Sequence, residues 1–299
     1  MKTMKSKFYS LALAAGMLSL TACSDDNTND SNNDKGNGIE NGSTLKGTIT
    51  EDVTLKAGNT YKLSGEYIVE AGATLNIEEG VKIISVYDNI VDYILVKQGA
   101  KINAVGTPDK PIVMTSEKEE PGAWGGIHIC GKAHTNAEGG KGSSEIGGAV
   151  YGGNDDADNS GTLQYIRLEY TGFAFDEEHE ANGISFYGVG NGTIVDHCEA
   201  YKGSDDGFEF FGGSVNVSNM VVVSCSDDSF DWTEGWNGKG TDLVAYQEAK
   251  ATLGYDCDCL IEADNNENDN AATPVSHPVL KNLILQVTAK ANKASVCVA

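Results

Sequence analysis

Apolar and polar residues alternate in short runs along the chain after Thr44, and most of these runs end at a glycine. The segment 55–63 (LKAGNTYKL) returns in varied form at 69–77 (VEAGATLNI) and again at 96–102 (VKQGAKI). Strict alternation buries one face of a strand, and glycine permits the backbone conformation of a tight turn. The pattern therefore predicts short strands joined by glycine turns, without a long amphipathic helix.

A second repeat sets the spacing of these strands. The segment 204–210 (SDDGFEF) matches 226–232 (SDDSFDW), which lies 22 residues later. A repeat of this length, with three short strands in each turn, is what a parallel β-helix requires. A β-sandwich would need hairpin turns and a leucine-rich repeat its Leu/Asn spacing, and the sequence has neither pattern. We therefore expect an all-β, single-stranded parallel β-helix (a solenoid) over residues 45–299.

Side-chain parity within the two matched segments separates core positions from surface positions. Phe208 and Phe210, like Phe230 and Trp232, share one parity and are expected in the core, because side chains alternate across a strand. Phe211 has the opposite parity and is expected to point outward to solvent.

The outward positions of the same segments carry carboxylates. A third coil follows the second by 31 residues, the 22-residue period with an insertion. We expect two columns on the outer face, one of Asp205, Asp227 and Asp258 and one of Glu209, Asp231 and Glu262. Carboxylates stacked about 4.8 Å apart repel one another, and oxygen-rich clusters suit calcium, so these six residues are candidate calcium ligands. The alternative is a solvated acidic face.

Three residues close to the columns are candidate ligand contacts. Asp206 and Asp228 belong to the same acidic runs, and Trp236 lies in a glycine-rich loop where its ring can stack on a sugar. Three other acidic loops, at 155–158, 176–180 and 264–269, are interpreted as solvated loop tips.

The charge balance limits the partners. The chain has 21 Lys and Arg against 44 Asp and Glu, for a net charge of -23. Phosphate backbones and anionic lipid would repel it, so nucleic-acid binding is excluded. Arg167 is the only arginine, which weighs against a mechanism that needs an arginine clamp. Cations and neutral or cationic partners remain.

The first residues have the pattern of an export signal. Lys2, Lys5 and Lys7 precede an apolar run at 11–20. This order is typical of a secretory signal peptide, and the run is shorter than the roughly 20 residues that span a bilayer.

The sequence Leu20-Thr21-Ala22-Cys23 resembles the lipobox of bacterial lipoproteins. The resemblance implies a signal peptide at 1–22 and cleavage before Cys23, which would then carry fatty acyl chains such as palmitate. Residues 23–44 would form a flexible acidic tether to the outer membrane. The SDD run at 24–26 resembles the signal that sends such lipoproteins to the cell exterior. An ordinary signal peptide with a chance cysteine is the alternative.

Several segments of the body carry a family resemblance. The segments 124–127 (WGGI), 151–153 (YGG), 158–167 (DNSGTLQYIR) and 206–213 (DGFEFFGG) resemble a widespread family of secreted or surface β-helix proteins of Gram-negative bacteria. The resemblance implies a right-handed, pectate-lyase-like parallel β-helix, but it implies no particular reaction.

Three classes of function compete. A surface protein that binds glycan or another surface polymer is favoured, because no complete catalytic set appears. A polysaccharide lyase or glycoside hydrolase is the alternative: the aspartates at 205–206 and 227–228 can supply an acid and an ionised carboxylate. The run at 204–206 faintly resembles the Gly-Asp-Asp element of polygalacturonases, whose other elements are absent. The third class is a structural surface protein.

The cysteines of the body leave their pairing open. An exported chain permits disulfides, yet no zinc-ligand spacing is present, and small buried hydrophobes are the favoured interpretation. These residues are Cys130, Cys198, Cys225, Cys257, Cys259 and Cys297.

Overall fold

The computed structural model describes residues 38–88, 90–174, 179–288 and 295–298. All of them belong to one compact unit, residues 36–299. Cys23 and the predicted signal peptide at 1–22 lie outside the described residues. None of the helices in the described ranges has the length and apolar character needed to cross a membrane.

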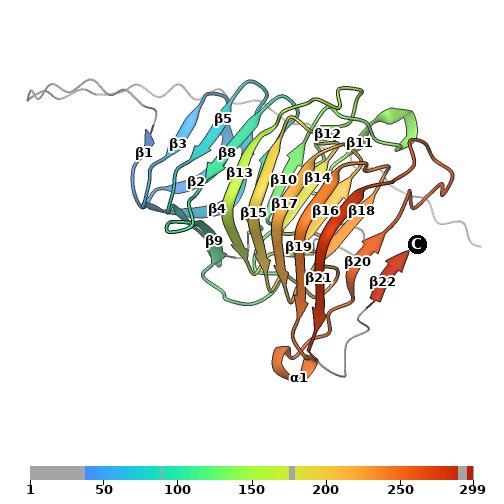
Figure 1. Ribbon diagram of the computed structural model, residues 1–299. Coiled ribbons are helices and arrows are strands. Elements are labelled where there is room, and N and C mark those ends of the chain that lie inside the picture. The colour runs from blue at the N-terminus through green and yellow to red at the C-terminus, as the bar shows by residue number, and fades with distance from the viewer. Residues whose placement is uncertain (1–37, 89, 175–178, 289–294, 299) are drawn as a thin grey trace, which may run out of the picture. The chain divides into compact units, whose positions relative to one another are not determined.

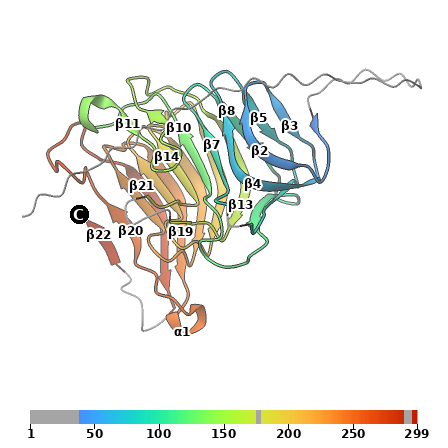
Figure 2. The ribbon, with the colours of Figure 1, turned by 180° about the vertical axis from the view of Figure 1, so that it is seen from behind.

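Parallel strands stack coil on coil to form three faces, as the sequence predicts (Figures 1 and 2). The first face begins with β1 (Gly38–Ile39), β3 (Val53–Leu55), β5 (Thr74–Ile77) and β8 (Lys101–Val105). The second contains β2 (Thr44–Ile49), β4 (Thr60–Val69), β6 (Lys82–Ser85) and β9 (Ile112–Ser116). The third contains β7 (Tyr93–Val96), β10 (Ile127–Cys130), β14 (Ile184–Tyr187), β16 (Phe208–Phe211) and β18 (Phe230–Thr233).

Long strands in the second half of the chain serve two faces at once. They lie side by side in Figure 1 and are β13 (Gly161–Glu169), β15 (Ile194–Tyr201), β17 (Asn216–Val223), β19 (Lys239–Gln247) and β21 (Val279–Val287). Each bends at one residue with positive φ, namely Tyr165, His197, Asn219, Asp242 or Asn282. The bend turns the second half of the strand onto the next face, so β13 pairs first with β8 and then with β9.

Some elements lie outside the stacked faces. A small antiparallel pair, β11 (Gly142–Ser143) and β12 (Val150–Tyr151), belongs to a long excursion between β10 and β13. The helical segments described are η1 (Glu138–Gly140) and α1 (Lys250–Leu253), both a single turn long. β20 (Cys259–Ala263), by contrast, lies beside β18 in the next coil of the third face, and it also pairs in parallel with β22 (Ser295–Val298).

The register of the third face agrees with the predicted repeat. Phe208 lies opposite Phe230, and Glu209 lies opposite Asp231, at the 22-residue period. Two hydrogen bonds continue this register into β20: Ser229 N donates to the Cys259 carbonyl at 3.0 Å and Asp264 N donates to the Trp232 carbonyl at 2.9 Å. The third coil therefore sits where the 31-residue spacing places it.

The core prediction is confirmed for the four aromatic residues of the two matched coils. Phe208, Phe210 and Phe230 are at most 2% exposed, and Trp232 is also buried. The rings of Phe208 and Phe230 stack with their centroids 5.9 Å apart. Alternation of side chains along each strand is thus sufficient to identify the core side of the coil.

Trp236 is wrongly predicted as a sugar-stacking residue. It is only 1% exposed, and its ring stacks on Phe210 with centroids 4.1 Å apart. The indole N–H donates to the Val215 carbonyl at 3.2 Å, which satisfies its one polar atom inside the core. The loop after β18 turns its tryptophan inward, so the ring fills the coil interior and meets no ligand.

Phe211 also differs from its prediction. Its side chain points away from the main core, but it is 9% exposed and stacks on Tyr187 with centroids 4.5 Å apart. Tyr151, from the excursion between β10 and β13, packs on the same Tyr187 ring at 5.2 Å. The excursion covers this part of the outer face, and parity alone does not predict such a cover.

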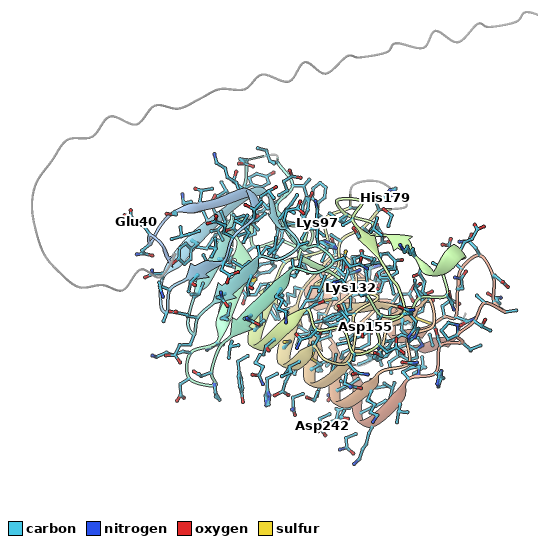
Figure 3. All side chains as sticks on the ribbon, turned by 90° about the horizontal axis from the view of Figure 1, so that it is seen from above. Glu40, Lys97, Lys132, Asp155, His179 and Asp242 are labelled. Carbon is cyan, nitrogen blue, oxygen red and sulfur yellow. A yellow bond between two sulfur atoms is a disulfide. The ribbon has the colours of Figure 1, made fainter. Side chains whose placement is uncertain are left out.

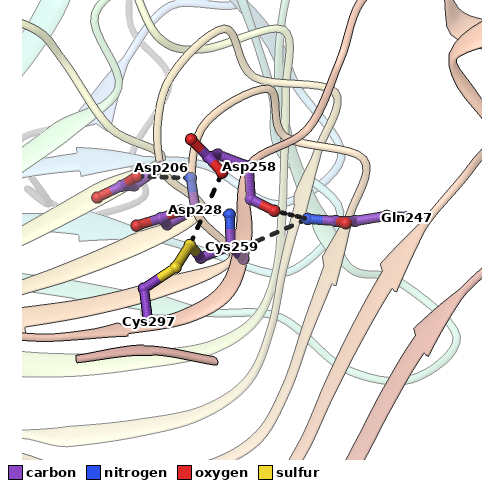
Figure 4. The surroundings of a disulfide bond; sticks show 6 residues. All are labelled: Asp206, Asp228, Gln247, Asp258, Cys259 and Cys297. Atoms are coloured by element: carbon purple, nitrogen blue, oxygen red, sulfur yellow. Dashed lines mark hydrogen bonds between the residues drawn. A yellow bond between two sulfur atoms is a disulfide. The ribbon is translucent and has the colours of Figure 1, made fainter. Parts of the chain in front are cut away.

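The cysteines divide into one disulfide and four buried thiols among the described residues. Cys259 of β20 is bonded to Cys297 of β22 (Figure 4). The other four behave as small buried side chains, as favoured from the sequence: Cys130, Cys198, Cys225 and Cys257.

Candidate functional site

An acidic pocket of about 580 Å³ opens on the outer side of the third face. It is lined by ten carboxylates and one histidine, and no Lys or Arg contributes to its wall within the described ranges. We call this group the acidic pocket; it consists of Glu145, His179, Glu180, Asp205, Asp206, Glu209, Asp227, Asp228, Asp231, Glu262 and Glu267. In Figure 3, His179 lies on the opposite side of the coils from Asp242, which marks the bend of β19.

The structure brings most of the predicted column residues into this pocket. Both Asp205 and Asp227 line it, and so do all three members of the second column. Asp258 is outside the lining, although its N–H donates to the Asp227 carbonyl at 3.1 Å and its charge helps raise the pKa of Asp227. The columns form because the coils repeat in register, so that each coil presents its carboxylates beside those of the previous one.

Asp206 and Asp228 have a structural role as well as a place in the lining. The N–H of Asp228 donates to Oδ1 of Asp206 at 2.9 Å, and the N–H of Cys259 donates to Oδ1 of Asp228 at 2.6 Å (Figure 4). One coil earlier, Asn182 Oδ1 accepts from the N–H of Asp206 at 3.2 Å. This ladder of side chains holds successive turns together and fixes where the two carboxyl groups enter the pocket.

Excursions from the coils supply residues that sequence reasoning missed. Glu145, from the segment between β10 and β13, accepts a hydrogen bond from the Tyr187 hydroxyl at 3.1 Å. Glu180 and Glu267 come from two of the acidic loops interpreted as solvated tips; both line the pocket, and Glu267 is exposed, in agreement with that interpretation. The excursions do not repeat along the sequence, so their acidic residues were the only feature of the sequence that could indicate a contribution to the pocket.

One buried oxygen of the pocket lacks a donor. Oδ1 of Asp231 is fully buried and accepts no hydrogen bond from the described residues. Its register neighbour Glu209 accepts a bond from Asn182 Nδ2 at 2.5 Å. Leaving a buried carboxylate oxygen without a partner is costly, so this atom points to a bound proton or cation.

Burial and mutual repulsion raise the pKa values of the pocket acids. Desolvation is the main cause, followed by neighbouring carboxylates, for Asp205, whose pKa rises to about 8. Desolvation together with a hydrogen bond to Glu262 raises the pKa of Asp228 to about 9. The pKa values of Asp231 and Glu145 rise to about 7, with burial again the largest cause. Near neutral pH, some of these groups therefore hold protons unless positive charge enters the pocket.

The spacing of the carboxylates fits metal coordination. Four triads have ligand oxygens that lie within 4.8 Å of one another. The outer triad is Glu180, Asp205 and Asp227; the middle triad is Asp206, Asp227 and Asp228; the two inner triads are Asp206, Glu209 and Asp231, and Asp228, Asp231 and Glu262. These clusters can hold a metal ion, and a donor set made only of oxygen suits a hard cation.

Comparison with known proteins assigns the chain to a family. A search of curated proteins finds no match. The family model of the pectate-lyase-like beta helix domain matches residues 47–298, which include the strands of the three faces from the second half of β2 onward and the whole acidic pocket. The chain therefore belongs to the pectate-lyase-like beta helix domain family.

Proposed function

We propose that the protein is a surface lipoprotein whose β-helix binds a glycan or another surface polymer through calcium held in the acidic pocket. One observation carries the proposal: ten carboxylates converge on one pocket, and a buried oxygen of Asp231 has no donor among the described residues. Calcium takes several oxygen ligands in a flexible geometry, which suits carboxylates supplied by three coils and three excursions.

Burial argues against a merely solvated acidic face. Asp205, Asp206 and Asp228 are only 7%, 6% and 2% exposed. Carboxylates this deeply buried need protons, donors or a cation to offset the loss of hydration. A bound cation would supply that charge and leave coordination positions for a ligand's oxygens.

The class of ligand follows from the pocket's size and charge. A volume of about 580 Å³ is within the usual range for small-molecule sites, roughly 300–1,000 Å³. The chain's net charge of -23 disfavours polyanions that lack a bridging cation. Hydroxyl and carboxyl oxygens of sugars are hard ligands that can complete the coordination of calcium, which favours a glycan.

The proposed location rests on the sequence before the coils. The lipobox at 20–23 and the SDD run at 24–26 support acylation of Cys23 and display of the β-helix on the outside of the outer membrane. We expect Cys23→Ser to move the protein from the membrane fraction to the soluble fraction. Continued anchoring of that variant, without detergent, would contradict the lipoprotein assignment.

A glycan array probed with the detergent-solubilised full chain tests the proposed binding. We expect binding to some glycans in millimolar calcium, loss of binding in chelator, and loss in Asp231→Asn. Asp109→Asn is the matched control, because it removes one exposed carboxylate outside the pocket lining. Binding that persists unchanged in chelator would overturn the calcium dependence.

Catalysis on a polysaccharide is the second candidate. It is favoured by carboxyl groups of raised pKa close to other carboxylates, the pairing that glycoside hydrolysis uses. Other β-helix proteins act on polysaccharides, but that is an analogy of fold. Assays for new reducing ends and for unsaturated products, on the glycans that bind, would separate catalysis from simple binding.

A further inference from the structure

The four carboxylate triads of the acidic pocket overlap in a way that limits how many cations can bind together. The middle triad shares a residue with each of the others: Asp227 with the outer triad, and Asp206 or Asp228 with an inner one. The two inner triads share Asp231. The outer triad has no residue in common with either inner triad. Two cations can therefore each have three carboxylates of their own only if one occupies the outer triad and the other an inner one.

Charge favours two cations over one. The triads together contain eight different carboxylates, and no cationic lysine or arginine lines the pocket within the described ranges. A single divalent cation would leave most of that negative charge uncompensated in a partly buried space. Charges this close together in a partly buried space interact strongly, so the remaining ionised acids would still repel one another.

A second observation, a buried oxygen without a hydrogen-bond donor in the described part of the chain, marks the inner position. Oδ1 of Asp231 is fully buried, lacks a hydrogen-bond donor among the described residues, and belongs to a side chain that lines the pocket. Asp231 is also the one residue common to both inner triads. An oxygen in this state is a ready ligand, because coordination would remove the cost of leaving it unpaired.

We propose that the acidic pocket binds two calcium ions at once, one at the outer triad Glu180, Asp205 and Asp227 and one at Asp231 with an inner triad. The inference rests on the proposed calcium-dependent function and adds the number and the places of the ions. The outer ion ties the excursion that carries Glu180 to two coils. The inner ion ties β18 to β16 if it occupies Asp206, Glu209 and Asp231, or β18 to β20 if it occupies Asp228, Asp231 and Glu262.

Equilibrium dialysis of the detergent-solubilised full chain against calcium, followed by metal analysis, tests this proposal. We expect two ions per wild-type chain. Asp205→Asn should lower the number from two to one by removing an outer ligand, and Asp231→Asn should do the same by removing an inner one. The double variant should bind none, and the exposed control Asp109→Asn should keep two. Far-UV circular dichroism of each variant checks that the β-helix remains folded.

The outcomes separate this inference from the proposed function. One ion per wild-type chain, with calcium-dependent glycan binding, would overturn the second site and leave the function in place. No bound calcium would overturn both. If folded Asp205→Asn or Asp231→Asn keeps both ions or loses both, the assignment of one ion to each triad is wrong.

Discussion

Oδ1 of Asp206 accepts a hydrogen bond from the backbone N–H of Asp228 at 2.9 Å, so one pocket carboxylate sets the position of the next. The same bond recurs between Asp228 and the N–H of Cys259. The residues that concentrate negative charge in the pocket are thus also the residues that connect its coils. This double role explains how a chain can stack so many acids without separating the strands that carry them.

The two roles of Asp206 can be separated by substitution. Asp206→Asn keeps an oxygen for the Asp228 N–H but removes a charge, so in chelator we expect it to be at least as stable as wild type. Asp206→Ala leaves a buried N–H unpaired, which typically costs about 1–3 kcal/mol. Urea unfolding at neutral pH measures both. Equal stability of the two variants would show that the ladder does not stabilise the fold.

The aromatic layers inside and outside the coil give a second prediction. Phe208 fills the core, and Phe211 is buried beneath the excursion that carries Tyr151. Truncation of a buried Phe to Ala costs about 3–5 kcal/mol, so both Phe208→Ala and Phe211→Ala should lower the urea midpoint clearly. Ile194→Ala, at a site that is 52% exposed, is the control and should have little effect. An unchanged midpoint for Phe211→Ala would mean that the excursion does not pack on this face in solution.

Local repetition made the fold and the columns predictable. Alternating residues define strands, the two SDD segments give the period, and the same parity that buries Phe208 turns Glu209 outward. The register follows from the period, because one-residue slips would bury the acids.

Residues outside the repeat were not predictable in this way. Trp236 follows β18 in an irregular turn, and nothing in its sequence neighbours indicates whether the loop folds inward. Glu145 reaches the pocket from an excursion whose path depends on the packing of Tyr151 and Ile146 against the outer face. Long-range pairing decides both positions, and a single sequence does not display it. The disulfide between Cys259 and Cys297 was not predictable for the same reason, since 38 residues separate the two cysteines.

His128 gives a pH prediction that is independent of the pocket. It is fully buried, its Nε2 lies 2.7 Å from the Gly125 carbonyl, and its Nδ1 has no partner among the described residues. Burial lowers the pKa of His128 from 6.5 to about 4. Between these values the unfolded chain binds the proton and the folded chain does not. The free energy of unfolding should therefore fall as pH falls from 6.5 towards 4, by up to about 3 kcal/mol from this residue.

The comparison with His128→Gln isolates that contribution. Glutamine keeps an N–H for the Gly125 carbonyl but does not titrate. Wild type should thus lose stability relative to this variant as the solution is acidified from pH 7 to pH 4, in urea unfolding series. A difference that stays constant over this range would show that His128 is accessible to protons in the folded protein.

The pocket carboxylates should give the opposite pH dependence when calcium is removed. The pKa values of Asp231, Asp205 and Asp228 are raised to about 7, 8 and 9, above those of the unfolded chain. The folded state then binds protons more tightly, so this stabilising contribution is complete below about pH 4 and is lost as pH rises through 7 to 9. In chelator, the melting temperature should therefore fall between pH 6 and pH 9. Bound calcium favours the ionised carboxylates, and saturating calcium should raise the melting temperature most at the upper end of that range.

Asp227→Asn combined with Asp231→Asn distinguishes repulsion from cation binding in the same melts. In chelator at pH 8, this variant should melt above wild type, because two of the mutually repelling charges are gone. In calcium, it should gain less than wild type, because it has lost ligands of both the outer and the inner triads. A wild-type melt that calcium does not shift at pH 8 would rule out the cation site. If calcium does not shift the wild-type melt and the double variant is nevertheless more stable than wild type in chelator, the pocket is a cluster of repelling acids that protons, and no metal, stabilise.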